Sequence, residues 1–388
     1  MKSNYKRIGD FIVECDTRND NDLPLELWGV SIDKKFIKSV ANVIGTDLSK
    51  YKIVRNNQFV CSLMQVSRDE KIPIDLWRGE NTIIVSPAYK VFQVLDTEQL
   101  LPEYLNMWFR RSEFDREASY YGVGGVRGSL EWGDFCEMKL PIPEISAQRS
   151  IVEAYNAIER RISVKRKIND NLEASGITIV KEGYGALNFI TETKEEIFSH
   201  KLLPGWSVVT IKDFCAEMKS GATPSRSNPE YWSNGTIPWL KSGEVHNNVI
   251  HNTEEHITGE ALSECSTKLL PYGTILMAMY GVTAGEVGYL GLPATTNQAI
   301  CGMICKNKSD ASWLFFTLLA FQKDISSQAT GGAQSNLSKE FIERIHILRP
   351  QRNCSDLEKI LYHIETNSAE INKLKTLQDL LLAKLSSR

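Results

Sequence analysis

Two long stretches of the chain place their apolar residues at the spacing of an amphipathic helix. The first runs from about Ile145 to Ala174 and the second from about Ser355 to Ser386. Each keeps a seven-residue period, which is typical of helices that pair with one another. We therefore predict two long helices, whose buried faces carry Ile151, Tyr155, Ile158, Ile162 and Leu172 in the first stretch and Leu357, Leu361, Ile364, Ile371, Leu374, Leu381, Leu382 and Leu385 in the second.

Local signals predict where these helices begin and end. Ser355 and Glu358 have the S-x-x-E form of a capping box, which favours a helix start at that point. Gly176 stands where a glycine just beyond the last helical residue would end the first helix. Polar residues interrupt both apolar stripes, at Lys165 and at Gln378. A second interpretation therefore stays open, in which each helix packs only on its own domain.

The rest of the chain mixes short apolar runs with turn signals in both halves. This mixture favours an α+β fold over a regular alternation of parallel strands and helices. We expect strands at residues 59–66, 82–94, 274–282 and 299–305, and short helices near residues 102–114 and 311–325.

An internal repeat organises the chain. Residues 124–143 align without a gap with residues 331–350. The number of residues that separates these two segments is nearly the same as the number that separates the matching residues near the start of each copy. Because identity between the copies is low, the repeat indicates an ancient duplication whose content has diverged. The matched residues are Ile8, Asp10 and Phe11 with Ile211, Asp213 and Phe214, then Gly124–Gly125 with Gly331–Gly332, Leu130 with Leu337, Met138 with Ile345, Leu140 with Ile347, and Pro143 with Pro350.

The repeat and the helices divide the chain into four segments. We predict one globular domain at residues 1–143 and a second at residues 201–350. Residues 144–200 are expected to hold the first long helix and a connector, because Gly183, Gly185 and a polar stretch follow the helical pattern. Residues 351–388 hold the second long helix. The expected arrangement is two globular domains separated by two long helices.

Composition sets the class of protein without pointing to a function. The 388 residues are 42% hydrophobic and 24% charged, which is ordinary for a globular protein of two domains or slightly more. There is no run of about 18 apolar residues, so we expect no membrane span. The first residues lack the apolar segment of a signal peptide, and we predict a cytoplasmic protein.

Charge and cysteine content narrow the function classes further. The net charge of -3 argues against a non-specific DNA binder that relies on many phosphate contacts. It permits a protein that recognises a DNA sequence and whose basic residues are confined to the contact region. The 8 cysteines include no C-x-x-C pair, so neither a zinc ribbon nor a disulfide scaffold is predicted. Cys301 and Cys305 are expected to be buried thiols.

Several short motifs, taken in order, resemble a known family. They are LPGW (203–206), GATPSR (221–226), Tyr231-Trp232, IPW (237–239), SPAY (86–89) with its counterpart NQAI (297–300), and PIPEISAQRSIV (141–152) before the first helix. With the duplication and the paired helices, they resemble the specificity (S) subunit of type I restriction–modification systems over nearly the whole chain. The first half lacks the LPGW and GxTP blocks, and the second helix lacks most of the proline–glutamine pattern that precedes the first.

The resemblance implies a geometric mechanism on double-stranded DNA. Each globular half is expected to be a target recognition domain that reads one short sequence, through the major groove, where all base pairs can be distinguished. The two helices are expected to form an antiparallel coiled coil. A helix of about 30 residues spans roughly 45 Å, and successive major grooves on one face of DNA lie about 34 Å apart. The target should therefore be split, and asymmetric because the halves differ.

The resemblance also implies partners and places catalysis in them. Two modification subunits that methylate adenine with S-adenosylmethionine are expected to dock mainly on the helices, and restriction subunits join for cleavage. S-adenosylmethionine, ATP and Mg are expected in those subunits, and no cofactor or metal in this chain. The sequence holds no NPPY-type motif, no G-x-G-x-x-G loop and no phosphate-binding loop. We interpret the E-x-K triplets at Glu137 and Glu217 as chance matches and predict a chain without catalysis.

Polar and basic residues in the loops are candidates for DNA contacts. The second half offers two amide side chains in its Gly–Gly loop, and Asn and Gln can pair with adenine through two hydrogen bonds. The candidates are Lys34, Lys35, Arg68, Lys71, Arg78, Tyr89 and Arg127 in the first half, and Lys219, Ser220, Thr223, Ser225, Arg226, Lys241, Tyr280, Gln334 and Asn336 in the second.

Two other polar groups are more ambiguous. Arg160, Arg161, Lys165, Arg166 and Lys167 form a basic run on the first helix, which either faces DNA phosphates or is the solvated face of the coil. His246, His251 and His256 are spaced by five, which places them on neither one helix face nor one strand face. We expect loop or surface histidines there and no zinc site.

Two other functions compete with DNA recognition. A fused restriction–methylation enzyme would need cofactor motifs, which the sequence lacks. A coiled-coil adaptor without a nucleic-acid partner would explain the helices but would not explain the duplicated, diverged halves. Apolar residues beyond those that one coil needs would leave an exposed patch, so we also predict that the isolated chain is poorly soluble.

Overall fold

The structure is a computed structural model in which the chain forms two compact units. Unit 1 comprises Met1–Arg161 with Leu374–Arg388, and unit 2 comprises Ile162–Lys373. Both boundaries fall inside the long helices, because each end of each helix packs on a different globular half. The described residues are 4–20, 23–40, 45–64, 66–123, 128–185, 187, 196, 199, 202, 204–329, 336–350 and 354–385.

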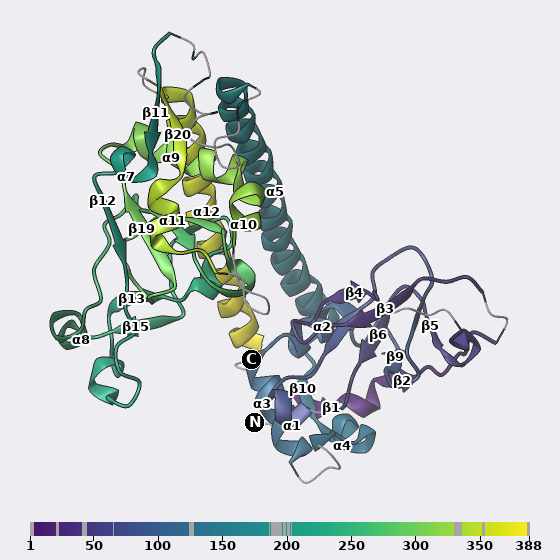
Figure 1. The fold of residues 1–388 in the computed structure, drawn as a ribbon. Coiled ribbons are helices and arrows are strands. Elements are labelled where there is room, and N and C mark those ends of the chain that lie inside the picture. Colours follow the sequence, from purple (N-terminus) through teal and green to yellow (C-terminus); the bar gives the residue numbers. More distant parts are fainter. Residues whose placement is uncertain are drawn as a thin grey trace. The chain divides into compact units, whose positions relative to one another are not determined.

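Unit 1 holds two four-stranded sheets and a short strand pair (Figure 1). The sheets have the orders β2-β9-β6-β7 and β4-β3-β8-β5, and the pair is β1-β10. The elements are β1 Tyr5–Arg7, η1 Ile8–Asp10, β2 Ile12–Glu14, β3 Leu27–Val30, β4 Phe36–Lys38, η2 Leu48–Lys50, β5 Lys52–Val54, β6 Gln58–Cys61, α1 Val66–Asp69, β7 Ile74–Leu76, β8 Ile83–Val85, β9 Lys90–Val94, α2 Pro102–Phe109, α3 Ser112–Gly122, α4 Trp132–Glu137 and β10 Lys139–Pro141.

Unit 2 holds a five-stranded sheet, a three-stranded sheet and a strand pair. Their orders are β12-β19-β16-β17-β14, β15-β13-β18 and β11-β20. The elements are β11 Trp206–Thr210, α7 Ile211–Phe214, β12 Glu217–Ser220, η4 Pro229–Tyr231, β13 Ile237–Leu240, η5 Ser242–Glu244, β14 Asn248–Ile250, β15 Glu255–Ile257, α8 Gly259–Glu264, β16 Ile275–Ala278, η6 Gly281–Thr283, β17 Val287–Leu290, β18 Thr295–Thr296, β19 Ile300–Ile304, α9 Lys308–Ala320, α10 Gln322–Ser327, α11 Lys339–Arg344 and β20 His346–Pro350.

The two units share one topology, which confirms the internal repeat. The order β2-β9-β6-β7 in unit 1 corresponds to β12-β19-β16-β17 in unit 2, and β4-β3-β8 corresponds to β15-β13-β18. The residues matched in the sequence occupy equivalent places. The amides of Ile8 and Ile211 donate to the carbonyls of Met138 and Ile345, and both isoleucines are fully buried. The α+β fold class is likewise confirmed.

Each unit has its own apolar core. In unit 1, the rings of Phe59 and Phe92 stack at 4.9 Å, and Phe109 meets Phe59 edge to face at 5.5 Å. In unit 2, α9 is buried along most of its length, and Trp313 and Phe316 belong to its core. Aromatic side chains bury large apolar areas, so these clusters give each unit a stable core of its own.

Two long helices, α5 (Ile145–Tyr184) and α12 (Ser355–Lys384), extend through both units. The start of α12 at Ser355 agrees with the capping-box prediction. The predicted end of the first helix was wrong, because α5 continues ten residues into the segment expected to be a connector. Gly176 lies inside α5, where an added Cβ would stand 2.4 Å from the ring of Phe316. Close packing against this ring explains the glycine.

The helices pair in antiparallel orientation, as side-chain contacts within each unit show. Asn169 contacts Ser368 in unit 2, and Glu159 contacts Gln378 in unit 1. The interpretation in which each helix packs only on its own domain was wrong, because the helices contact one another and α12 begins in the core of unit 2, with Leu357, and ends in that of unit 1, with Leu385. Of the predicted stripe, Tyr155, Ile162, Leu357, Leu361, Ile364, Ile371, Leu382 and Leu385 are buried, and Ile151, Ile158, Leu172, Leu374 and Leu381 are half-buried.

Among the described residues, no helix combines the length and the apolar content that a membrane span requires.

Candidate nucleic-acid interface

Strand register brings several loops of unit 2 to one edge of its larger sheet. Ser220 lies opposite Cys301, and Ala278 lies opposite Ile300, in antiparallel pairs. The segments that follow β12 and β16 and the segment that precedes β19 therefore leave the sheet at the same edge. We call this edge, with residues 221–236, 279–286, 297–299 and Asn336, the loop edge of unit 2.

Polar residues of this loop edge pair with one another, through side chains or through the backbone. The hydroxyl of Thr223 donates to Oε1 of Gln298 at 2.7 Å, and both side chains are exposed. Tyr280 forms an isolated antiparallel bridge with Asn336, and Gly281 directly after it has φ +78°. Three predicted residues therefore gather with Gln298, which the sequence analysis did not select. The signal that could have identified Gln298 is its position in the NQAI motif, in the segment that leads into β19.

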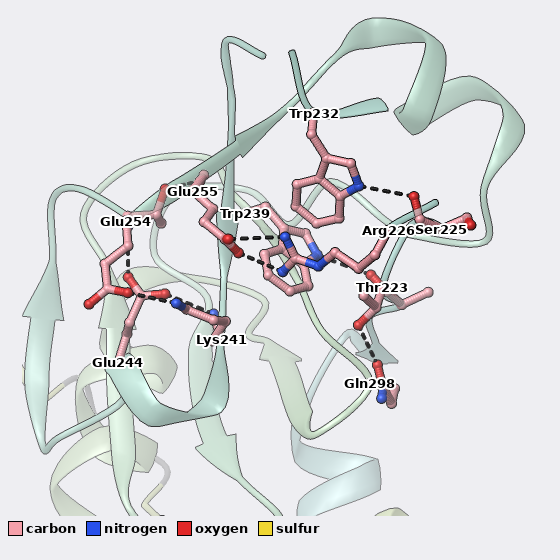
Figure 2. Close-up of polar contacts among 12 residues, drawn as sticks. Thr223, Ser225, Arg226, Trp232, Trp239, Lys241, Glu244, Glu254, Glu255 and Gln298 are labelled. Atoms are coloured by element: carbon pink, nitrogen blue, oxygen red, sulfur yellow. Dashed lines mark hydrogen bonds and ion pairs between the residues drawn. The ribbon is translucent and has the colours of Figure 1, made fainter. Parts of the chain in front are cut away.

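Arg226 is held in an aromatic and acidic clamp (Figure 2). Its guanidinium lies 3.7 Å from the ring centre of Trp232 and 5.0 Å from that of Trp239. Both outer nitrogens donate to the carboxylate of Glu255, at 3.0 and 2.7 Å. These hydrogen bonds hold the pKa of Glu255 below its usual value. Two-fold pairing and stacking are the arrangements that arginine makes best, so Arg226 anchors the 221–236 loop to β13 and β15.

Other basic residues of unit 2 are also paired. Nζ of Lys241 lies 2.6 Å from Glu254, and this hydrogen bond raises the pKa of the lysine. Lys219, beside Ser220 at the end of β12, pairs with Glu217 at 2.7 Å. Exposed pairs of this kind are weak, about 0–1 kcal/mol.

Unit 1 has an equivalent loop edge, defined by residues 15–20, 23–26, 62–64, 66–73, 86–89 and 128–130. Cys61 at the end of β6 lies opposite Lys90 at the start of β9 and opposite Ile74 at the start of β7. Arg68 and Lys71 are exposed in the segment after β6, and Tyr89 is half-buried in the segment before β9. Lys35 is exposed in the turn between β3 and β4.

Two predicted contacts of unit 1 lie elsewhere. Lys34 is buried at 6% exposure, with Nζ 2.7 Å from Asp115 and a hydrogen bond to the carbonyl of Phe109. Burial lowers the pKa of Lys34, and its prediction as a surface contact was wrong because the core holds it. Arg78 follows β7 at the opposite end of the sheet from Cys61. Arg127 and Gln334 lie outside the described residues.

The remaining polar groups include the histidines and the basic run on α5. In the described part of the chain, no three His, Cys, Asp or Glu side chains are arranged to hold a metal ion. His246 contacts Glu286, and His251 contacts the carbonyl of Glu365, so the histidines do not converge. Of the basic run on α5, Arg160, Arg166 and Lys167 are exposed, whereas Lys165 pairs with Glu370.

The comparisons with known proteins find similarity to DNA specificity proteins in the second half of the chain. Residues 204–376 match the family described as type I restriction modification DNA specificity domain. The MjaIX specificity subunit of Methanocaldococcus jannaschii is 34% identical over 151 residues, or 36% of this chain and 33% of that protein. The EcoR124I/EcoR124II specificity subunit of Escherichia coli is 26% identical over 146 residues, or 36% of each. The matches span about a third of these relatives.

A solved structure resembles the whole chain. The S subunit of the type I restriction–modification system from M. genitalium matches 99% of this chain and 96% of its own, with a TM-score of 0.55 and 14% identity. At that identity the likeness concerns the fold. The chain thus has the fold of an S subunit, and its residues 204–376 match the model of the type I restriction modification DNA specificity domain. The resemblance stated from the sequence is confirmed.

Proposed function

We propose that the chain is the DNA specificity subunit of a type I restriction–modification complex and reads an asymmetric, split target. Each unit reads one half-site with its loop edge, and the paired helices hold the two readers at a fixed spacing. The chain itself is non-catalytic, and partner subunits supply the adenine methyltransferase and the nuclease. The observation that carries this proposal is one topology repeated in two units with different loops.

The loop edges support two different half-sites. After β6, unit 1 has residues 62–64 and 66–73, with the helix α1 and the exposed Arg68 and Lys71. The equivalent segment of unit 2, residues 279–286, carries Tyr280 and the exposed Val282 instead. Base recognition depends on which donors, acceptors and apolar groups reach the base edges. Loops of different chemistry on equivalent scaffolds therefore read different bases.

The long helices support the positioning of partners. On α5, the apolar side chains of Val164 and Ile168 are exposed one turn apart, and on α12 those of Leu377 and Leu380 are exposed. Exposed apolar residues at helical spacing are typical of protein-binding faces. We infer that two modification subunits bind along these helices, with S-adenosylmethionine, ATP and Mg in the partner subunits.

Methylation mapping by single-molecule sequencing tests the proposal. Cells that carry the chain with its methyltransferase are compared with cells that lack the chain. A split, asymmetric motif with methylated adenine is expected only where the chain is present. An unchanged methylome in the presence of an active methyltransferase would contradict DNA recognition and would favour the adaptor function.

A further inference from the structure

A turn at the loop edge of unit 2 presents a fully exposed apolar side chain. Residues 279–286 connect β16 to β17, which pair in antiparallel orientation with Met277 opposite Val287 next to the turn. Val282 lies in η6 near the middle of this segment, and its side chain is 103% exposed. We call residues 279–286 the β16–β17 turn.

Backbone hydrogen bonds close the β16–β17 turn on both sides of Val282. The amide of Gly285 donates to the carbonyl of Ala278 at 2.8 Å. Within the turn, the amide of Ala284 donates to the carbonyl of Gly281 at 3.1 Å. Gly281 and Gly285 have φ of +78° and +89°, a region that favours glycine. The turn therefore holds Val282 in a defined position.

Side chains from two other segments anchor the same turn. Asn247 and Gln322 form a reciprocal amide pair, with hydrogen bonds of 3.0 and 2.9 Å. Nε2 of Gln322 also donates to the carbonyl of Gly285 at 3.2 Å, and Oγ of Ser326 donates to the carbonyl of Ala284 at 3.1 Å. A turn that is already ordered loses little conformational entropy when it binds, so this one is preorganised for contact.

A valine side chain can distinguish only one feature of the base edges. It has no hydrogen-bond donor or acceptor, so the donor and acceptor pattern of a base pair offers it nothing to bind. The edges in the major groove carry one apolar group as well, the C5 methyl group of thymine. An apolar side chain in contact with this methyl group favours thymine over the other bases.

The shape of the β16–β17 turn fits such a contact. The major groove is about 12 Å wide and admits a two-stranded β-ribbon, which is the form of the paired strands that carry the turn. Side chains that wedge between base steps are typically Phe, Leu, Ile, Met or Pro. The shorter valine suits contact with a methyl group at the base edge better than insertion into the stack.

We propose that Val282 reads a thymine in the half-site of unit 2, by contact with its C5 methyl group in the major groove. Val282 thereby determines specificity at a position that the polar side chains of the loop edge do not read. The inference rests on the proposed function, in which this edge faces the bases.

The test measures how tightly the chain, in complex with its methyltransferase, binds the target found by methylation mapping. Each thymine of the target is replaced in turn by deoxyuridine, which lacks only the C5 methyl group. Binding is measured for the wild type, for Val282→Ala and for the control Leu269→Ala. Leu269 is 45% exposed and precedes β16, at the opposite end of that strand from the β16–β17 turn.

At one thymine, deoxyuridine should weaken binding of the wild type and of the control about fourfold, the factor that burial of one methyl group gives. Val282→Ala should bind the unmodified target about tenfold more weakly. It should also be insensitive to deoxyuridine at that one position, which is the coupling that a double-mutant cycle detects. Because the side chain is exposed, the melting temperature of the variant should equal that of the wild type.

Two outcomes would overturn the inference and leave the proposed function intact. In the first, the wild type binds a split target, but Val282→Ala keeps the wild-type response to every deoxyuridine substitution, so the valine reads no thymine. In the second, Val282→Ala weakens binding of the methyltransferase itself, which places the valine in a protein interface. A wild type that recognises no split target would contradict the proposed function instead.

Discussion

Lys34 illustrates how a residue chosen for its charge can belong to the core. The side chain lies between α3 and the turn after β3, where Asp115 accepts hydrogen bonds both from Lys34 and from the amide of Ile72. Its backbone has φ +56°. The polar sequence around it, Asp33 to Lys35, predicts exposure, and only the tertiary position of Asp115 decides otherwise.

Breaking this pair should destabilise unit 1 strongly, whereas replacing both partners should not. We expect Asp115→Ala to lower the free energy of unfolding by about 3–5 kcal/mol, since a buried ammonium remains unpaired. The double variant Lys34→Met with Asp115→Asn should stay within about 1 kcal/mol of the wild type, because Asn still accepts from Ile72. Urea unfolding measures both. If the double variant folds and its DNA binding depends less on salt concentration than that of the wild type, Lys34 contacts a DNA phosphate and the buried-pair interpretation is wrong.

Gln298 should specify a base. Its amide is exposed at the loop edge of unit 2 and is oriented by the hydroxyl of Thr223. We expect Gln298→Ala to relax one position of one half-site and to weaken binding by about 1–3 kcal/mol. Binding to a set of single-base variants of the target measures this. The half-site read by unit 1 is the internal control, and equal relaxation of both half-sites would contradict the assignment.

At the scale of the elements, α5 shows that packing can require a glycine inside a helix. Gly→Ala inside a helix usually stabilises by about 1 kcal/mol, but at Gly176 a Cβ would meet the ring of Phe316. We expect Gly176→Ala to destabilise unit 2 by about 1–3 kcal/mol. Gly133→Ala in α4, where no atom lies within 4 Å of the added Cβ, is the matched control and should be neutral or stabilising. Thermal unfolding compares the two, and equal effects would contradict the packing argument.

Periodicity predicted the helices better than it predicted their ends. The heptad stripe identified α5 and α12, because a repeating apolar face is a property of the sequence itself. The end of α5 was missed because Gly176 serves a tertiary contact with Phe316. The segment 82–94 was expected as one strand and forms β8 and β9 in different sheets. The Ser86–Tyr89 link between them is where the chain changes sheet.

Candidate contacts were predicted less well than the fold, for a physical reason. Residue type indicates which side chains can bind DNA, whereas strand register decides which of them lie together. Register joins Thr223, Tyr280 and Asn336 to the unpredicted Gln298, and it places Arg78 at the other end of the sheet from Arg68. A single sequence does not specify register between distant strands.

For the whole molecule, the exposed apolar residues of the helices predict dependence on a partner. Val164 and Ile168 are 55% and 42% exposed. We expect the isolated chain to aggregate and Val164→Glu with Ile168→Lys to increase its soluble fraction while weakening methyltransferase binding at least tenfold. Light scattering and co-purification measure these effects. A double variant that binds the methyltransferase as tightly as the wild type would contradict a docking role for this face.

The strand pairs β1–β10 and β11–β20 affect how such a chain can acquire a new DNA target under the proposed function. In each unit the first strand pairs with the last, β1 with β10 and β11 with β20, so the chain enters and leaves the globular part at neighbouring points. Everything between those strands is therefore one insertion in the chain, whose core side chains, such as Phe316, also pack on the long helices. Under the proposed function, a recombination event between two genes, with crossovers in the segments coding for β11 and β20, would bring in a new half-site reader in a single step, provided that the incoming core packs on the same helix residues.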